Sequence, residues 1–544
     1  MIPDALLDLR RALALVRVVV RLLMPASVLA SRGRTTEAGV CLRLALEQLG
    51  VTYLKLGQFL AIRFDIVPPA IGRELDQLFD RVSPITYDQV RDVLAAELGD
   101  NPESLFLEID PQPIASASIA QVHRARLRDG RRVAIKVQRP GIERIVRADL
   151  RNMRRLAAAI DLFGLIGGLS ARETVQELGI WTLRELDFLT EADAADRLRR
   201  HVGPYEQIPE IHRDLSTPRV LTMELVDGLS LAMIGRLYDE GGETAVQAQL
   251  PGVDLSLALN RFFDGYLYQL FEVGFFHGDP HPGNVIIRPD GTVAYVDFGI
   301  FGELTAHELR IVRRHVEAIA SGDVAESLRY YLKQVYETAD TDMPAFKDAA
   351  SSVLRRWYEA SRDSSRTSVA DRHLGRYSGE MLDLVRRYHL TMRMSTLLFW
   401  RSLIIVNSTV LRFPGTVDPL TSSREFFEPT PTEIAADFVG AGLDSRRTLT
   451  AASLLRAAPI EIQRTLDDAA RSERQWLTET DEAGPVFRAN NRRARGIALA
   501  LVGLSLGIVG TGQSVASLDT TLRLVALVIV VPVAVWSFAE LSPR

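Results

Sequence analysis

The chain has 544 residues, and its formal net charge of −5 provides no basic field that would attract nucleic acid. This length allows more than one structural unit, and the hydrophobic fraction of 47% is high for a purely soluble protein, which suggests membrane contact. The single cysteine, Cys41, excludes an internal disulfide framework and is typical of a reducing compartment.

The first segment, residues 1–34, reads as a basic amphipathic helix, because four arginines interrupt its leucines and valines: Arg10, Arg11, Arg17 and Arg21. No small-residue cleavage site follows an apolar core, which argues against a secretory signal. Two interpretations stay open for this helix. It lies on a membrane surface, or it is an ordinary helix packed on the domain.

Between the two ends of the chain, the hydrophobic pattern is typical of an α+β domain. Thr86 and Gln89 form a capping box that opens a helix ending near Gly99. Residues 113–138 carry short apolar runs around the turn at 128–131, which predicts a β-hairpin. Further helices are expected at 142–163, at 172–201 and directly after Gly302, and a strand with a turn at 220–231.

The motif VAIK ends this hairpin and places Lys136 where the third strand of protein kinases carries a phosphate-binding lysine. Only four of the 64 basic residues are lysines, so the presence of a lysine at this position indicates a specific role and not simply a place on the surface.

A kinase lysine is held by a carboxylate from a helix. Glu185, Asp187 and Glu191 are candidates; Asp187 and Glu191 would share a helix face, and we assign Glu191. The alternative is a solvated acidic face.

The motif HGDPHPGN, followed by DFG, carries three residues in the order of a phosphoryl-transfer site. Asp279 is expected to orient or deprotonate a hydroxyl or a water. Asn284 and Asp297 are hard oxygen ligands that suit Mg²⁺ beside the phosphates of ATP or ADP. His277 is expected to brace the loop and not to bind zinc, because no third ligand is spaced to join His277 and His281.

The loop before VAIK keeps the register of a kinase glycine-rich loop but has alanine in place of every glycine. Alanine does not readily adopt positive φ, so this loop should be stiffer than a glycine-rich loop, with serine hydroxyls available for phosphate contacts. The alternative is an Ala-rich turn at a domain edge. The residues expected to contact the nucleotide are Ala115, Ser116, Ala117, Ser118, Ile119, Ala120, Val122, Lys136, Glu224 and Val226.

The segments YLKLGQ, ASASIAQVH, VAIKVQRPGI, ELDFLTEA and HGDPHPGNV…VDFG occur together and in order between about residues 40 and 320. In this respect the chain resembles the ABC1/ADCK/UbiB family of atypical kinases. The resemblance implies a kinase-like fold and a role in isoprenoid-quinone or other lipid metabolism at membranes. It also implies a family signature. Lys55, Gly57 and Gln58 would belong to a helical extension that covers the peptide site, and Glu185 and Asp187 would be the acidic pair that faces them.

The C-terminal region contains two uncharged runs, 496–512 and 524–539, each about 25 Å long as a helix. Basic residues flank both ends, so the positive-inside rule predicts a membrane hairpin with cytoplasmic ends. Gly503 and Gly507 would allow the two helices to approach closely. The alternative is a buried helical pair of a soluble fold.

The predicted architecture is a two-lobed, protein-kinase-like α+β fold with an N-terminal helical extension and a C-terminal transmembrane hairpin. The expected segments are a basic helix (1–34), the helical extension (35–110), the N-lobe (111–231), the C-lobe (232–425), a linker with a charged helical region (426–492) and the hairpin (493–544).

The sequence therefore favours an ATP- and Mg²⁺-dependent atypical kinase or ATPase, anchored to the cell membrane with its kinase-like domain on the cytoplasmic side. Helix follows soon after the DFG motif and no Ala-Pro-Glu is present, so protein phosphorylation is not expected. Expected partners are the membrane, a lipid such as a quinone precursor, and lipid-biosynthetic enzymes, but no nucleic acid. Two alternatives stay open: a soluble phosphotransferase resembling aminoglycoside and choline kinases, and a nucleotide-binding scaffold without chemistry.

Overall fold

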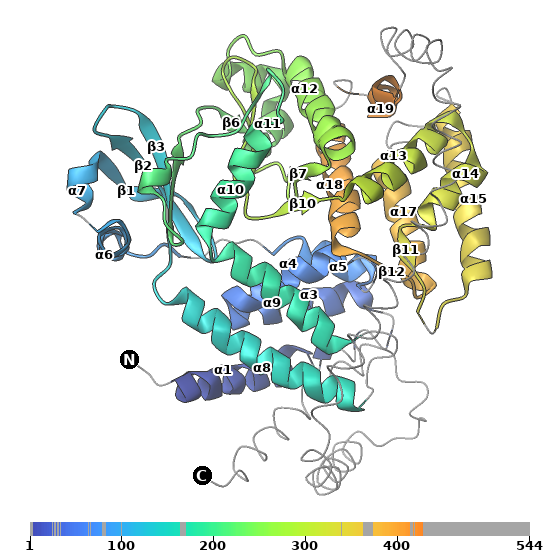
Figure 1. Ribbon diagram of the computed structural model, residues 1–544, viewed down its shortest axis with the longest axis horizontal. Helices are drawn as coiled ribbons and strands as arrows, with labels where there is room; N and C mark the ends of the chain where they lie inside the picture. The colour runs from blue at the N-terminus through green and yellow to red at the C-terminus, as the bar shows by residue number, and fades with distance from the viewer. Residues whose placement is uncertain are drawn as a thin grey trace, which may run out of the picture. The chain divides into compact units, whose positions relative to one another are not determined.

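A computed structural model describes residues 4–427, apart from residues 24, 27–28, 30–31, 33, 64, 66, 79–82, 100, 164–169, 339, 363–373, 414–416 and 418. The chain divides into two compact units, and residues 4–426 lie in the first, whose arrangement is shown in Figure 1. Apart from residues 426 and 427, the predicted segments 426–492 and 493–544 lie outside the described residues, and the predicted hairpin is not described.

The N-lobe is built on a four-stranded antiparallel sheet in the order β1-β2-β3-β5. Apolar side chains from β2, β3 and β5 meet Val90 and Leu94 of α6 to form its core. The predicted capping box opens α6, where Thr86 accepts from the Gln89 N–H, and Gly99 ends it in the left-handed conformation. The strands and helices of this lobe are α6 (Tyr87–Leu98), α7 (Pro102–Leu105), β1 (Phe106–Ser116), β2 (Ala120–Leu127), β3 (Arg132–Gln138), α10 (Phe188–Arg199), η2 (Arg213–Leu215) and β5 (Val220–Glu224).

The boundary predicted between residues 110 and 111 is wrong, because it falls inside β1. Pro111 and Pro113 interrupt the strand pattern in the sequence. They are tolerated because β1 is an edge strand, where a missing N–H can face away from the sheet. Since α6 also contributes to the core of the sheet, the N-lobe begins before α6 and not at residue 111.

The helical extension is assembled from two separate parts of the sequence. Its helices are α1 (Asp4–Val18), the π-helical turn η1 (Val19–Leu23), α3 (Thr35–Leu49), α4 (Val51–Ile62), α5 (Pro69–Leu75), α8 (Ile142–Phe163) and α9 (Ala171–Glu185). The first five precede the sheet and the last two follow β3, yet α8 contacts α1, α4 and α9. The helices α8 and α9 thus belong with the extension, although the predicted segments placed them in the N-lobe.

The helix predicted at 172–201 is two helices. Helix α9 ends at Glu185, and Asp187 caps the next helix, α10, by accepting a hydrogen bond from the Leu189 N–H at 3.1 Å. The expectation that Asp187 and Glu191 share a helix face is therefore wrong, because Asp187 is outside the helix that carries Glu191.

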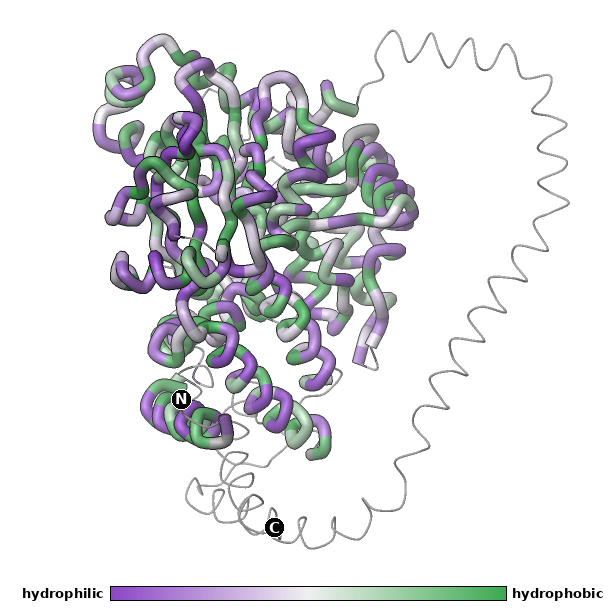
Figure 2. The backbone as a smooth tube through the Cα atoms, turned by 60° about the vertical axis from the view of Figure 1, so that its left-hand side comes forward, coloured by the Kyte–Doolittle hydropathy of each residue, from purple (hydrophilic) through white to green (hydrophobic). Residues whose placement is uncertain are grey.

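The N-terminal helix α1 is packed on the extension. Arg11 donates to Asp149 of α8 at 2.7 Å, and Arg151 of α8 donates to Asp8 at 2.6 Å. Figure 2 shows both hydrophilic and hydrophobic residues along this helix, which begins beside the N-terminus. Its outer face leaves three leucines exposed: Leu6, Leu9 and Leu13. The packed interpretation is confirmed for one face of α1.

The C-lobe is mainly helical and carries the loops that follow β7 and β9. Strands β4, β9, β8 and β6 form one small sheet, β7 pairs with β10, and β11 pairs with β12. The elements are β4 (Glu206–Gln207), β6 (Leu229–Ser230), α11 (Leu231–Gln249), α12 (Leu255–Tyr268), η3 (Gln269–Val273), β7 (Phe275–His277), β8 (Val285–Ile287), β9 (Val293–Tyr295), β10 (Phe301–Glu303), α13 (Ala306–Ser321), α14 (Val324–Tyr331), β11 (Val335–Tyr336), α15 (Met343–Arg362), α17 (Leu374–Arg387), β12 (Thr391–Met392), α18 (Met394–Leu411) and α19 (Pro419–Phe427).

Within the part of the chain that the structure describes, α18 is the one helix long and apolar enough to cross a membrane. It is 61% buried, and Phe399, Trp400 and Leu403 are almost inaccessible to solvent. We therefore describe α18 as a core helix of the C-lobe. One face of it is left at the surface.

Candidate active site

Lys136 lies at the centre of a cluster of charges between β3, α10 and the DFG segment. Its Nζ contacts both carboxylate oxygens of Glu191, at 2.9 and 2.8 Å, and Oδ1 of Asp297 at 3.1 Å. The predicted pairing of Lys136 with Glu191 is thus present in the structure. Burial disfavours the ammonium, but the charges of Asp297 and Glu191 outweigh it and raise the pKa of Lys136.

Asp297 differs from Glu191 in its access to solvent. The Asp297 side chain is 52% exposed, whereas Glu191 is 4% exposed. Its backbone has φ of 62°, which is uncommon for a residue other than glycine and costs about 1 kcal/mol or more. Burial opposes ionisation, yet the Lys136 ammonium holds the pKa of Asp297 well below its ordinary value. Asp297 therefore presents an ionised carboxylate that is accessible from solvent.

The loop that carries Asp279 is braced by His277, as the sequence predicted. His277 Nδ1 accepts from the Asp279 N–H at 3.2 Å, so Nε2 carries the proton and donates to the Val296 carbonyl at 3.1 Å. Burial lowers the pKa of His277, which keeps the ring neutral. Tyr266 OH donates to the His277 carbonyl from α12. This brace joins the Asp279 loop to the strand before DFG.

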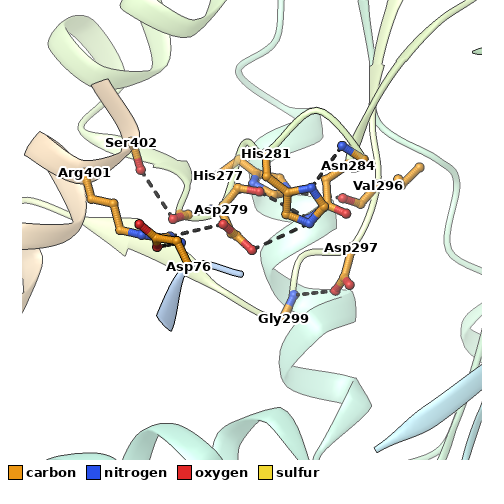
Figure 3. Close-up of polar contacts among 12 residues, drawn as sticks. Asp76, His277, Asp279, His281, Asn284, Val296, Asp297, Gly299, Arg401 and Ser402 are labelled. Carbon is orange, nitrogen blue, oxygen red and sulfur yellow. Dashed lines mark hydrogen bonds and ion pairs between the residues drawn. The ribbon is translucent and has the colours of Figure 1, made fainter. Parts of the chain in front are cut away.

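Asp279 has a partner that the sequence did not reveal. Arg401 of α18 donates from Nη1 to Asp279 Oδ1 at 3.1 Å, and its Nη2 lies 4.0 Å from Asp76 at the end of α5 (Figure 3). On the other side, His281 Nε2 lies 3.9 Å from Asp279 Oδ2. Burial opposes ionisation of Asp279, but the charge of Arg401 outweighs it and lowers the pKa of the carboxyl.

Asn284 and Asp297 fit the ligand set of Mg²⁺. Asn284 donates from Nδ2 to the Asp279 carbonyl at 3.2 Å, which leaves its Oδ1 as the atom available to a cation. Mg²⁺ needs only one or two such protein oxygens when phosphates and waters supply the others. Among the described residues no group of three or more His, Cys, Asp or Glu could hold a metal.

Comparison with known proteins agrees with this geometry. The profile of the ABC1 atypical kinase-like domain matches residues 77–331. A probable protein kinase UbiB of Marinobacter nauticus is 30% identical over 71% of this chain and 69% of its own length.

The chain belongs to the ABC1 atypical kinase family. A chloroplastic protein of Arabidopsis thaliana, named ACTIVITY OF BC1 COMPLEX KINASE 7, is 35% identical over 50% of this chain and 38% of its own. An uncharacterized protein of Mycobacterium tuberculosis, Rv0647c, is 37% identical over 50% of this chain and 54% of its own. An ABC1 domain is kinase-like, and nucleotide binding is a general property of kinase-like folds.

The alanine-rich loop of this ABC1 domain is a tight turn that Arg139 holds. Arg139 donates to the Ala117 carbonyl at 3.0 Å and to Ser116 Oγ at 2.8 Å. Ser116 is thereby engaged, whereas Ser118 is buried and its Oγ has no hydrogen-bond partner among the described residues. A buried hydroxyl without a partner costs about 1–3 kcal/mol, so a ligand oxygen at Ser118 would satisfy it. Of the two predicted hydroxyl contacts, Ser118 is the better candidate.

Three other residues predicted to contact the nucleotide lie near Lys136 or at the end of β5. Val122 lies directly opposite Lys136 in the β2–β3 pair. Glu224 ends β5, and its carboxylate accepts from Gln207 at 2.9 Å and from the Glu210 N–H at 3.2 Å. Val226 follows in the connection towards the C-lobe and is half-buried. The Glu224 side chain is thus engaged within the protein.

The family signature of this ABC1 chain is held by a second buried ion pair. Lys55 Nζ of α4 lies 2.7 Å from Glu185 Oε2 of α9. Gly57 lies against Leu78 and Leu46, and Gln58 Oε1 is buried without a hydrogen-bond partner in the described part of the chain. Asp187 caps α10 instead of joining this pair. The charge of Lys55 also contributes to lowering the pKa of Asp297, so the extension acts electrostatically on the site.

Proposed function

We propose that this protein is a membrane-associated, ATP- and Mg²⁺-dependent phosphotransferase or ATPase that supports isoprenoid-quinone or related lipid metabolism. The observation that carries the proposal is the contact of one ammonium, Lys136, with both Glu191 and Asp297. In kinases this ammonium binds the phosphates, the helix carboxylate holds it, and the DFG aspartate binds the metal. Asn284 and Asp297 would hold Mg²⁺, which neutralises charge on the phosphates when bound.

A peptide is a poor acceptor for this site. Strand β10 pairs with β7 immediately after the DFG motif, and α13 begins at Ala306, so the described chain offers no activation segment that could bind a peptide. Asp76, from the extension, reaches Arg401 beside Asp279. The extension therefore borders the approach to Asp279, which supports a small acceptor or water.

The membrane component of the proposal rests on α1 and on the predicted C-terminal hairpin. Leu6, Leu9 and Leu13 are exposed on one face of α1, and Arg10 and Arg17 are exposed along the same helix. Leucines bordered by arginines are typical of helices that lie in the interface of an anionic bilayer. This face is available because the opposite face is packed on α8.

The test is nucleotide turnover by the full chain in liposomes, with mass analysis of the lipids for a phosphorylated product. We expect turnover that requires Mg²⁺ and is abolished by Asp297→Asn. A phosphorylated lipid would identify a kinase, and phosphate release alone would identify an ATPase. Turnover that is unchanged in Asp297→Asn, or absent from the wild type, would refute the proposal. A protein that stays in the aqueous phase on phase partitioning would refute the membrane component.

A further inference from the structure

A cavity of about 520 Å³ lies beside the candidate active site, along the exposed face of α18. This volume lies within the range of about 300–1,000 Å³ that is usual for small-molecule sites. Its wall on α18 is formed by Arg401, Ile404, Ile405, Ser408 and Arg412, which recur at the spacing of one helix face. The other faces of α18 form the core of the C-lobe, so this face is the one left for a ligand.

The cavity is elongated and mainly apolar. Arg401 and Arg412 are eleven positions apart, which corresponds to about 16 Å along the helix. Between these two ends lie Ile404 and Ile405, and Leu382 of α17 and Pro282 complete the apolar lining. An extended hydrocarbon body fits such a wall better than a compact polar molecule.

The arginines at the two ends already have acidic partners. Arg412 donates to Asp239, and Arg401 contacts both Asp279 and Asp76. Their charges are therefore balanced within the protein. Arg73 of α5 and Asp383 of α17 also line the cavity and add one charge of each sign. A ligand with an anionic group is therefore not needed to neutralise the lining, and an uncharged polar group is sufficient.

Two residues that line the cavity also flank Asp279. Arg401 Nη1 lies 3.1 Å from Asp279 Oδ1, and His281 Nε2 lies 3.9 Å from Asp279 Oδ2, so the cavity lies beside this carboxylate. A ligand hydroxyl that enters from this side can share the Asp279 carboxylate with Arg401. A carboxylate accepts several hydrogen bonds, and a hydroxyl donates one.

We propose that this cavity binds the phosphoryl acceptor, and that the acceptor is an elongated apolar molecule with a hydroxyl group at the Asp279 end. This inference rests on the proposed function and specifies its acceptor. The hydroxyl oxygen forms a bond to the γ-phosphorus of ATP while the bond from that phosphorus to the bridging oxygen breaks. ADP leaves, and the hydroxyl proton passes to Asp279. Arg401 keeps Asp76 as its partner when the hydroxyl is bound.

The test uses 1-decanol as the probe, with decyl methyl ether as a matched molecule that lacks the hydroxyl. Binding to the full chain is measured by native mass spectrometry, and decyl phosphate is measured after incubation with ATP and Mg²⁺. We expect decanol to bind and decyl phosphate to form, while the ether yields no phosphorylated product. Ile405→Trp, which fills the cavity, is expected to lower decanol binding and decyl phosphate formation at least about tenfold.

The control for Ile405→Trp is Ile180→Trp, at an exposed isoleucine of α9 outside the cavity, which should leave both readouts unchanged. Basal nucleotide turnover should stay within about twofold in Ile180→Trp, because Ile180 is exposed on α9 and does not line the cavity. Equal decyl phosphate formation in wild type and Ile405→Trp would overturn the cavity as the acceptor site. Nucleotide turnover without decanol binding or decyl phosphate would overturn the inference and leave the proposed function. Loss of all turnover in the wild type would overturn both.

Discussion

The described part of the chain buries two lysine–glutamate ion pairs with similar shortest distances between nitrogen and oxygen. Lys136 lies 2.8 Å from Glu191, and Lys55 lies 2.7 Å from Glu185. The lysines are 8% and 6% exposed, and these two are half of the four lysines in the chain. In each pair the glutamate comes from the end of one helix or the start of the next, on the two sides of Asp187.

The difference between the pairs is their surroundings. Lys136 has a second carboxylate, Asp297, that is half exposed, so its ammonium can be shared with an incoming phosphate. The Lys55 pair joins α4 to α9, two helices of the extension. A buried ion pair by itself adds little stability compared with apolar residues of similar size. Removing only one of its two partners is costly, because the other is left as an unpaired buried charge. The comparison shows that the neighbouring open carboxylate, and not the ion pair, distinguishes a binding site from a structural link.

The same substitution in both lysines tests this distinction. Lys136→Met is expected to lower nucleotide turnover by about 10²–10³-fold, because it removes a positive group that would contact the phosphates. Lys55→Met is expected to change turnover far less, since Lys55 pairs with Glu185 and adds only a smaller charge effect than Lys136 at Asp297. Both are measured as Mg²⁺-dependent phosphate release by correctly folded protein. Equal losses in the two variants would contradict the distinction.

The second prediction concerns stability, for which we expect the Lys55 pair to be the more sensitive of the two to the loss of its lysine. Lys55→Met should lower the free energy of unfolding by about 3–5 kcal/mol, because Glu185 is left as an uncompensated buried charge. The double variant Lys55→Met/Glu185→Leu should recover most of this loss. Denaturant unfolding of the single and double variants measures both quantities. If the double variant is no more stable than the single variant, the Lys55 pair does more than link two helices.

The sequence predicted the Lys136–Glu191 pair, because VAIK and the acidic candidates around Asp187 are both local signals, although the shared helix face of Asp187 and Glu191 was wrong. It missed Arg401, since the contact with Asp279 spans 122 residues and nothing in the apolar sequence of α18 marks one arginine. Arg139 was missed for a similar reason, as it follows VAIK in sequence but contacts the alanine-rich turn in space. Local motifs therefore identified the site, and the side chains that position it required the tertiary structure.

The break between α9 and α10 was missed although the sequence contained a signal for it. Aspartate is a preferred N-cap residue, and Asp187 precedes the apolar start of α10. The break was not predicted, because the residues on both sides of it show helical periodicity and were interpreted as one helix. The break has a consequence for the comparison of the two pairs, because it turns Glu185 towards the extension and Glu191 towards the sheet.

The third prediction extends the comparison to a buried group that stays uncharged. His315 of α13 is buried, and burial lowers its pKa to about 4 from 6.5. Its Nδ1 hydrogen bonds to the Ser327 carbonyl at 2.8 Å, and Nε2 accepts from Tyr377 OH at 3.2 Å.

Between pH 6.5 and 4 the unfolded state binds a proton at this position that the folded state does not. Stability should therefore be complete above pH 6.5 and fall by about 3 kcal/mol as the pH is lowered towards 4. This pH dependence should be absent from His315→Gln and retained in His307→Gln, at an exposed histidine of the same helix. Unfolding measured across this pH range checks it, and an equal slope in both variants would assign the effect to other groups.

The smallest predicted effect concerns the packing around the Lys55 pair. A Cβ at Gly57 would overlap Leu78 Cδ1 and lie 2.9 Å from Leu46 Cδ1, and both leucines are buried. Gly57→Ala should therefore cost about 1–3 kcal/mol through overpacking. Gly72→Ala on α5 is the matched control, because a Cβ there meets nothing within 4 Å and alanine favours the helix. If the two alanines have equal effects on unfolding, the leucines yield to the methyl group, and Gly57 is not required by the packing of the extension.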